Sequence, residues 1–323
     1  MRFLLDPEQR AFADSLNAML TAADTPSVVR AWSRGEHTSG RALWRRIAEA
    51  GVFALAIPEA YEGLGPRPVE LAVAFVELGR HAVPGPVVET VMAAALLAEP
   101  GPAKRLLPAL ASGEVMATAA PAGSYALDGD VATTRLAWDA DGLRSAPGPS
   151  GPVRASLDPA RRLTRLLPGG ELLTREPPLA HALTWARLAT AAQALGVGLA
   201  LLDRTVAYVR QRTQFGVPVG SFQAVKHQLA DAKIALEFAR PLLFGAALTM
   251  TESDVAAAKV TACEAAYRTA RTALQLHGAI GYTAEYDLSL WLTKARALRM
   301  SWGSPDECRA AVLNGVSGGG RRS

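Results

Sequence analysis

The sequence predicts a mainly α-helical protein with a small β region at its centre. Apolar residues recur at helical spacing in the first and last thirds of the 323-residue chain, and the middle is rich in Gly and Pro. Half of the residues are hydrophobic and 20% are charged, which is enough apolar material for a large core. We therefore expect two or three compact regions.

Residues 1–113 form a predicted N-terminal helical domain. Asp6, Pro7 and Gln9 are spaced as an N-cap, a first-turn proline and a capping-box partner, so a helix should begin here. The segment RALWRRIAEAG repeats its apolar residues on one face and ends at Gly51, a typical helix C-terminus. VELAVAFVELGR and VVETVMAAALLAE are apolar on more than one face, which predicts buried helices before LLPALASG closes the region.

Residues 114–178 form a predicted β domain of reduced size. Short alternating pieces such as VRASL replace the long helical periods here. The pairs Asp128-Gly129 and Asp141-Gly142 are typical of β-hairpin turns.

Residues 179–316 form a predicted C-terminal helical bundle. Helical periodicity covers about 181–212, 222–247, 252–278, 284–299 and 305–315. Most of these segments are longer than the average globular helix of ~11–12 residues, which favours a bundle of antiparallel neighbours. The tail, residues 317–323, is expected to be disordered.

Composition argues against several classes of function. The formal charge of +4 is dispersed and aromatic residues are only 6%, so we expect no nucleic-acid surface. The apolar runs are shorter than a membrane span, and the N-terminus becomes charged too early for a signal peptide. Cys263 and Cys308 are too few for a disulfide framework or a metal site, so reduced, partly buried thiols in a soluble cytoplasmic protein are expected.

Two segments carry residues suited to a dinucleotide. Arg212 ends a long helix, where its planar guanidinium can bind a pyrophosphate, and Phe215 offers a flat surface to a heterocycle. Gln214 and Gln223 supply amide donors and acceptors. The stretch from Gln275 to Gly281, which includes Gly278, breaks a helix and exposes backbone N–H groups.

Each of these residues has a plain structural interpretation as well. Arg212 alone would more often pair with a charge at a helix end, and Phe215 alone would be core. His227 is expected to be a packed histidine rather than a catalytic one. Asp231 is expected to pair with a neighbouring helix rather than act as a base.

Three segments in order resemble the acyl-CoA dehydrogenase family. They are LWRRIAEAGVFALAIPEAYEGLG, RTQFGVPVGSFQAVKHQLAD and QLHGAIGYTAEYDLSLWLTKAR, and the resemblance covers most of the chain outside 114–178. It implies an N-terminal helical domain, a β domain and a C-terminal four-helix bundle. It also implies that Arg212, Gln214, Phe215, Gln223, Gln275 and Gly278 contact FAD, largely that of a neighbouring subunit.

The catalytic base of the family is absent from both places where the resemblance locates it. In the turn that usually reads Glu-Gly-Thr this chain has Trp302-Gly303-Ser304, and an indole cannot accept a proton. The alternative position, on the helix before the arginine motif, is Ala186. Asp306 and Glu307 lie near the turn, but carboxylates after Pro305 are expected to serve the helix N-terminus.

The middle region departs from the family too. ATAAPAGSYALDG is all that remains of its flavin-binding loop, and the second flavin motif has no counterpart. The resemblance is therefore strongest to the short, base-lacking subunits of actinobacterial heteromeric acyl-CoA dehydrogenases of steroid side-chain degradation.

The expected function is that of a subunit that completes the FAD site of a larger, competent partner in an α2β2 tetramer. The resemblance implies an acyl-CoA substrate, a steroid side-chain CoA thioester among the options, and an electron-transfer flavoprotein as acceptor. Two alternatives stay open. One is a self-sufficient homotetrameric flavoenzyme with an unrecognised base, and the other is a flavin-free acyl-CoA-binding or scaffold protein.

Overall fold

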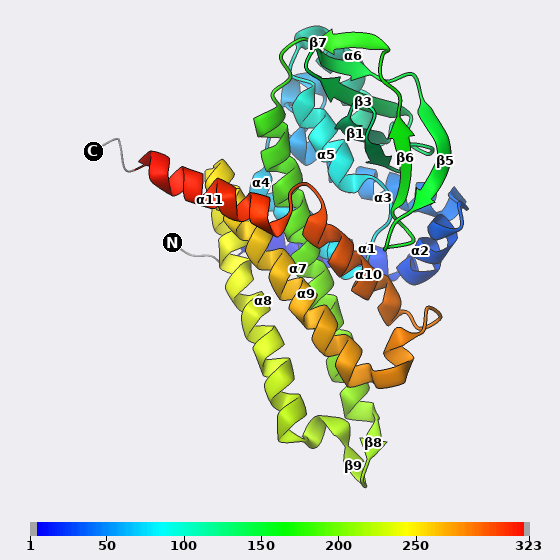
Figure 1. Ribbon diagram of the computed structural model, residues 1–323, viewed down its shortest axis with the longest axis vertical. Helices are drawn as coiled ribbons and strands as arrows, with labels where there is room; N and C mark the ends of the chain where they lie inside the picture. The colour runs from blue at the N-terminus through cyan, green and yellow to red at the C-terminus, as the bar shows by residue number, and fades with distance from the viewer. Residues whose placement is uncertain (1–4, 320–323) are drawn as a thin grey trace.

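The computed structural model describes residues 5–319 and confirms a mainly helical protein with a small sheet region (Figure 1). The sheets lie at one end of the molecule beside the N-terminal helices, and the long C-terminal helices extend away from them (Figure 1). Helices occupy 7–111, strands 117–174 and helices again 179–319. The predicted division into three domains follows these changes and stays a prediction.

The N-terminal region is built from six α-helices and two short 3-10 turns. The helices are α1 (Pro7–Thr21), α2 (Thr25–Ser33), α3 (Thr38–Glu49), α4 (Pro68–Arg80), α5 (Val87–Leu96) and α6 (Pro100–Ala111), and the turns are η1 (Phe53–Ala56) and η2 (Glu59–Tyr61). The predicted capping box is confirmed, because Asp6 Oδ1 accepts from the Gln9 backbone N–H at 2.8 Å and Gln9 Oε1 accepts from the Asp6 backbone N–H at 3.1 Å. Gly51 follows the C-cap of α3 with φ +81°, as expected of a glycine at a helix end.

The buried helices α4 and α5 join the N-terminal region to the first helix of the bundle, α7 (Leu179–Gln211). Gly79 and Gly196 stand where α4 and α7 cross, and a Cβ atom at either would overlap a backbone carbonyl of the other helix. This close approach fixes the two regions against each other through one continuous core.

The β region consists of two small sheets. Its strands are β1 (Ala117–Pro121), β2 (Tyr125–Leu127), β3 (Thr134–Asp139), β4 (Gly142–Ser145), β5 (Pro149–Ala155), β6 (Arg162–Leu166) and β7 (Glu171–Thr174). The sheet orders are β1-β3-β4-β7 and β2-β6-β5, and β1 and β3 pair in parallel.

Only one of the two Asp-Gly pairs belongs to a hairpin. Asp141-Gly142 lies at the turn between antiparallel β3 and β4, where Asp139 is opposite Gly142. The hairpin prediction for Asp128-Gly129 is wrong, because β2 pairs with β6 and β3 with β1. Asp128 is instead fully buried at φ +51° and accepts from the Trp32 indole at 3.1 Å.

The C-terminal region consists of five α-helices. Besides α7 they are α8 (Gln223–Thr249), α9 (Glu252–His277), α10 (Leu288–Met300) and α11 (Pro305–Gly319). Between α7 and α8 the chain forms a two-stranded ribbon, β8 (Thr213–Gln214) with β9 (Val217–Pro218), and the turn η3 (Val219–Ser221). The predicted segments are confirmed within a few residues. The predicted disordered tail is wrong for 317–319, which belong to α11, and the rest of that tail lies outside the described residues.

Helix α7 is the one helix in the described part that is long and apolar enough to cross a membrane, but its most apolar window is wholly buried within the fold. Cys263 and Cys308 are both fully buried rather than partly buried, and neither forms a disulfide. Burial raises the pKa of the Cys263 thiol to about 11, which makes it unreactive.

Candidate functional site

The loop between α10 and α11 carries Trp302, and its indole points toward the N-terminal region. Trp302 adopts φ +56°, and its Nε1–H donates to Glu89 Oε1 of α5 at 3.2 Å. Glu89 is a single acid within the apolar helix α5 and only 2% exposed. This hydrogen bond joins the C-terminal bundle to the N-terminal helices.

Beside this contact lies a cleft of about 200 Å³ between the β region and the helices. It is lined by Glu89, Trp302, Ser301, Arg161 and strand residues that include Ala119, Ala120, Tyr125 and Leu163. The Arg161 guanidinium is 4.0 Å from Glu89 Oε1, and Glu89 Oε2 has no hydrogen-bond partner among the described residues. Burial raises the pKa of Glu89, and Arg161 and the Trp302 hydrogen bond oppose that rise.

Two buried cations hold the Trp302 loop in place. Arg187 Nε donates to the Trp302 carbonyl at 3.1 Å, and Lys259 Nζ donates to the Gly303 carbonyl at 2.6 Å. Their side chains come from α7 and α9, so the loop is fixed by the core of the bundle. Ala186, the alternative base position, is completely buried in α7 and carries no polar group.

Asp306 and Glu307 serve the N-terminus of α11, as expected. Glu307 Oε2 accepts from the Ser304 backbone N–H at 2.6 Å, and this bond lowers the pKa of Glu307. Asp306 pairs with Arg309 at 2.9 Å and is 93% exposed. Neither carboxylate lines the cleft.

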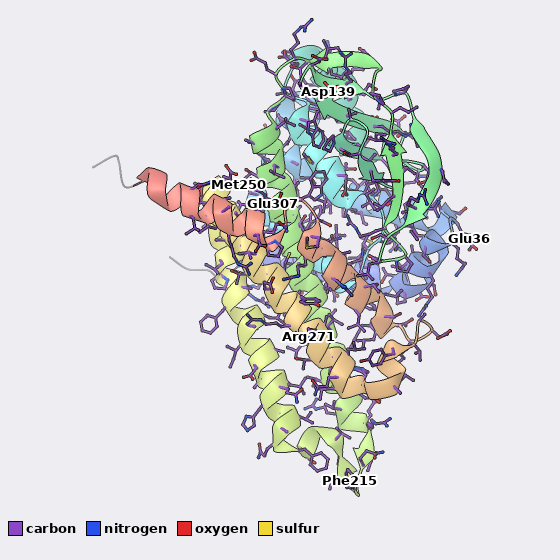
Figure 2. All side chains as sticks on the ribbon, viewed as in Figure 1. Glu36, Asp139, Phe215, Met250, Arg271 and Glu307 are labelled. Atoms are coloured by element: carbon purple, nitrogen blue, oxygen red, sulfur yellow. The ribbon has the colours of Figure 1, made fainter. Side chains whose placement is uncertain are left out.

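The residues of the arginine motif lie at the far end of the bundle. Arg212 is the C-cap residue of α7, and its guanidinium carbon is 5.8 Å from the centroid of the Tyr208 ring. The Tyr208 ring stacks on the His277 ring, with 4.1 Å between their centroids. No carboxylate within 5–319 pairs with Arg212, so its interpretation as a helix-end ion pair is wrong. Phe215 is 92% exposed at the tip of the β8–β9 ribbon, so its interpretation as core is wrong too (Figure 2).

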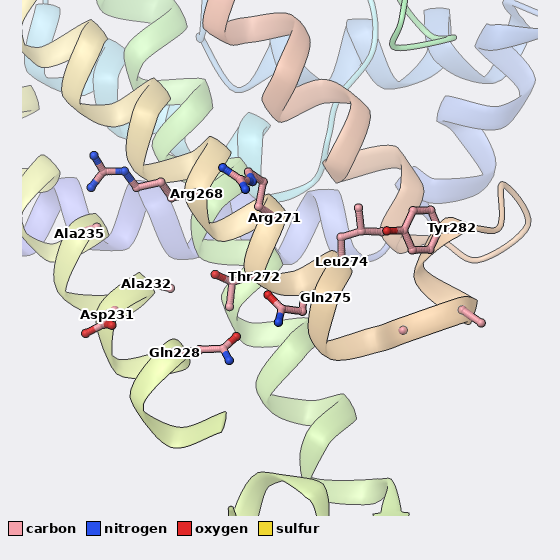
Figure 3. Close-up of a pocket in the computed structure, with 12 residues that line it drawn as sticks. Gln228, Asp231, Ala232, Ala235, Arg268, Arg271, Thr272, Leu274, Gln275 and Tyr282 are labelled. Atoms are coloured by element: carbon pink, nitrogen blue, oxygen red, sulfur yellow. The ribbon is translucent and has the colours of Figure 1, made fainter. Parts of the chain in front are cut away.

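A groove of about 820 Å³ runs between α8 and α9, and we call it the α8/α9 groove (Figure 3). From α8 it is lined by Gln228, Asp231, Ala232 and Ala235, from α9 by Arg268, Arg271, Thr272, Leu274 and Gln275, and beyond α9 by Gly278, Ala279 and Tyr282. Gln228 and Gln275 point toward each other across it (Figure 3). Gly278 has φ +64° and ψ −140°, a conformation suited to glycine, and open space beside its Cα.

The structure brings only some of the predicted site residues together. Gln275 and Gly278 line the α8/α9 groove, whereas Arg212, Gln214, Phe215 and Gln223 lie outside its lining, on the ribbon and at the start of α8. His227 is exposed, so its interpretation as a packed histidine is wrong.

Sequence reasoning missed four residues of these two sites. Arg268 and Arg271 were missed in the groove, although with Gln275 they follow an i, i+3, i+7 pattern that places them on one helix face. Glu89 and Arg161 were missed in the cleft. The signal for Glu89 was a lone acid in an apolar helix, but nothing local marks Arg161, which reaches the cleft only through the fold.

The α8/α9 groove fits the polyanionic half of a dinucleotide. Arg268 and Arg271 are exposed cations, with no ion pair to a carboxylate in the described part of the chain, and the two glutamines supply amides. The cleft is less suited to a flavin ring, because Ala119 and Ala120 of β1 offer it no side-chain hydrogen bond. Across residues 5–319, no group of three or more His, Cys, Asp or Glu side chains could hold a metal ion.

The chain folds into N-terminal helices, a small β region and a long helical bundle, and a cleft lies where the three meet. This is the arrangement of the acyl-CoA dehydrogenases. The comparisons agree with this class. The profile "Acyl-CoA dehydrogenase, N-terminal domain" matches residues 6–114, and "Acyl-CoA dehydrogenase, C-terminal domain" matches 179–315.

Among curated proteins, the chain is similar to acyl-CoA dehydrogenase IpdE2 of Mycobacterium tuberculosis (strain ATCC 25618 / H37Rv). The two are 34% identical over 93% of this chain and 95% of the relative. Among solved structures, a variant of the Tcur3481-Tcur3483 steroid ACAD has a TM-score of 0.82 at 26% identity, over 97% of this chain and 98% of that one. The ChsE4-ChsE5 complex from Mycobacterium tuberculosis shares the fold, with a TM-score of 0.84 at 24% identity. The match covers 98% of this chain and 99% of the chain in that complex. This chain belongs to the acyl-CoA dehydrogenase family.

Proposed function

We propose that this chain is a subunit of an FAD-dependent acyl-CoA dehydrogenase that lacks the catalytic base and completes the FAD site of a competent partner subunit. The observation that carries the proposal is the Trp302–Glu89 hydrogen bond at 3.2 Å, formed where the family places its base. Tryptophan has an N–H donor and no lone pair that can take the α-proton of an acyl thioester.

The geometry of the Trp302 loop supports the proposal that the base is missing. Arg187 and Lys259 bind the backbone carbonyls of Trp302 and Gly303, so the indole is held over Glu89 rather than swung out of the cleft. A cleft of about 200 Å³ with a buried acid and an alanine-lined strand is a poor place for an acyl chain and a flavin ring together.

The other half of the proposal rests on the exposed end of the bundle. FAD supplies the hydride acceptor of the dehydrogenation when it is bound. Arg268, Arg271 and Gln275 would hold its diphosphate and adenosine half from this chain, with Arg212 contributing from the end of α7. These groups are open to solvent, so a cofactor seated mainly in another subunit could reach them.

The substrate we propose is an acyl-CoA, with a steroid side-chain CoA thioester as the favoured class, because one structural relative is described as a steroid ACAD. An α2β2 assembly with a larger subunit is supported by the fold shared with the ChsE4-ChsE5 complex. The proposed electron acceptor is an electron-transfer flavoprotein, and the proposed location is the cytoplasm.

A self-sufficient flavoenzyme is the second candidate, and one observation favours it. Glu89 is a buried carboxylate in the cleft, its pKa is raised by burial, and one of its oxygens is free of hydrogen bonds within the described residues. It could be the unrecognised base if Trp302 moved away. Asp306 and Glu307 do not qualify, because both are engaged at the start of α11.

The deciding experiment compares flavin absorbance and acyl-CoA turnover of the chain purified alone and co-purified with a dehydrogenase encoded beside it. The proposal expects little flavin and no turnover alone, and one flavin site per heterodimer with turnover in the complex. Turnover by the isolated chain that is abolished in Glu89→Gln would favour the self-sufficient enzyme. Absence of flavin in both preparations would favour a scaffold.

A further inference from the structure

Three rings at the far end of the bundle are in contact with one another beside Arg212. The Tyr208 ring stacks on the His277 ring, with 4.1 Å between the centroids and 20° between the planes. The Tyr286 ring follows, and its centroid is 5.6 Å from that of His277. We call Tyr208, His277 and Tyr286 the ring cluster. It joins the end of α7 and the end of α9 to the segment just before α10.

Tyr208 contacts both segments that carry the predicted FAD contacts. The ends of α7 and α9 lie side by side there (Figure 1). The Tyr208 carbonyl accepts from the backbone N–H of Arg212 at 3.0 Å, and the guanidinium carbon of Arg212 is 5.8 Å from the Tyr208 ring centroid. Tyr208 Oη donates to the His277 carbonyl at 3.3 Å. His277 ends α9, and the next residue, Gly278, turns the backbone at φ +64°.

His277 is a fixed and neutral member of the ring cluster. Its side chain is 3% exposed, and its Nδ1 is 2.8 Å from the Ala273 carbonyl oxygen. A carbonyl oxygen only accepts, so Nδ1 carries a hydrogen and donates. Burial lowers the pKa of His277, and the bond to Ala273 opposes that fall. A neutral imidazole can stack on Tyr208 without placing a second positive charge near Arg212.

The outer end of the ring cluster is held by the N-terminal region. Arg30 of α2 donates to the Ala284 carbonyl at 2.9 Å and to the Glu285 carbonyl at 2.8 Å. Its guanidinium also pairs with Asp287 at 2.9 Å. These three bonds surround Tyr286 in the chain, so they fix the segment from which its ring meets His277.

The Arg212 side chain, by contrast, is exposed and held only by the ring beside it. Within residues 5–319 its guanidinium forms no hydrogen bond and no ion pair, and its recorded contact is the Tyr208 ring. A guanidinium within ~6 Å of a ring centroid is attracted by the negative face of the ring. This attraction restricts where the guanidinium lies and leaves its N–H groups free to donate to a ligand.

We propose that Tyr208 and His277 are positioning residues of the FAD site. Their stacked rings hold the Arg212 guanidinium at one place relative to the Gly278 turn, so that the two segments bind the FAD diphosphate as one unit. The inference rests on the proposed function, because it takes Arg212 as a contact of FAD. Tyr208 acts through Arg212, and His277 acts through Tyr208.

The first test replaces Tyr208 in this chain and measures FAD affinity of the co-purified complex by fluorescence titration. Tyr208→Leu should weaken FAD binding about two- to fivefold, which is the range that ~0.5–1 kcal/mol for an exposed cation–π contact gives. Tyr208→Phe keeps the ring and should keep wild-type affinity, with a small fall in the melting temperature from the lost Oη bond. Tyr267→Leu is the matched control, because the Arg299 guanidinium lies 5.0 Å from the half-buried Tyr267 ring and neither residue lines the α8/α9 groove. Unchanged affinity in Tyr208→Leu, or an equal loss in Tyr267→Leu, would overturn the proposal.

The second test separates positioning from a general structural role. Tyr208→Leu should cost no further FAD affinity in a chain that already carries Arg212→Ala. His277→Ala should weaken FAD binding in the presence of Arg212 only, and His277→Phe, which keeps a neutral ring, should bind FAD as the wild type does. Losses of equal size with and without Arg212 would overturn the proposal.

Failure of the proposed function is distinguishable from failure of the positioning role. If Arg212→Ala alone leaves FAD affinity unchanged, Arg212 is not a contact of FAD and the proposed function fails at this end of the bundle. If Arg212→Ala weakens FAD binding and Tyr208→Leu does not, the proposed function stands and only the positioning role is wrong.

Discussion

The Trp302–Glu89 hydrogen bond makes a sharp prediction for Trp302→Phe. This change keeps an aromatic ring in the cleft, removes the N–H that donates to Glu89 Oε1 at 3.2 Å, and makes the ring smaller, as Trp44→Phe does in the control below. A hydrogen bond to a charged group contributes ~1.5–3 kcal/mol. At roughly 2–4 °C per kcal/mol for a domain of 150–250 residues, the melting temperature should fall by about 3–12 °C.

The size of that loss should depend on pH, because Glu89 titrates. Burial raises its folded pKa above the unfolded value of ~4.3, so the native state binds more protons than the unfolded state in the interval between the two. Stability therefore falls as pH rises through that interval. The hydrogen bond from the Trp302 indole lowers the pKa of Glu89. Without that bond the folded and unfolded pKa values of Glu89 lie further apart, so Trp302→Phe should lose more stability at high pH than at low pH.

The assay is the melting temperature of wild type and Trp302→Phe at about pH 5 and about pH 8, in the form in which the wild type purifies. Trp44→Phe is the control, since the Trp44 indole donates to the uncharged Gly113 carbonyl at 3.1 Å and its loss should not depend on pH. Glu89→Gln should remove most of the pH dependence and reduce the cost of Trp302→Phe. Equal losses at both pH values, with no coupling to Glu89→Gln, would refute the reasoning.

Three further predictions concern the cofactor and the base. Trp302→Glu should not give activity to the isolated chain, because it places a second carboxylate beside Glu89 in a cleft whose β1 alanines offer a flavin no side-chain hydrogen bond. Acyl-CoA-dependent bleaching of bound flavin in that variant would contradict this. Arg212→Ala made only in this chain should weaken FAD binding by the complex about ten- to a hundredfold, because a hydrogen bond to a charged group contributes ~1.5–3 kcal/mol. If Arg212 has only a structural role, the substitution would instead lower the melting temperature and leave FAD binding unchanged. Arg271→Ala should act in the same direction and Arg271→Lys less, measured by fluorescence titration of FAD; equal affinities in all three would remove the groove from the site.

The helical half of the fold could be predicted because its signals are local. The capping box of Asp6 and Gln9 satisfies backbone N–H groups within one turn, and each bundle helix repeats its apolar face every 3.6 residues. These interactions form between residues a few positions apart, so the sequence displays them directly. The sequence also places Trp302 in the turn where the resemblance locates the family's base, so the absence of the base could be proposed from the sequence and stays a prediction.

The β region shows the limit of local signals. Asp141-Gly142 joins two strands that pair with each other, but Asp128-Gly129 lies between strands that pair with distant ones, and only strand order tells the two apart. Asp128 is a buried acid that accepts from Trp32, 96 positions earlier in the chain. No local pattern encodes a contact of that separation.

By itself the sequence determined a mainly helical fold, a resemblance to the family, and Trp302 and Ala186 at the two positions where that resemblance locates a carboxylate. The tertiary structure decided what stands there instead. Glu89 and Trp302 are 213 positions apart, and they meet because α5 packs on α7 while Arg187 and Lys259 fix the loop. The exposure of Arg271 was decided in the same way, because a helix has several faces and only packing determines which one is left open to solvent.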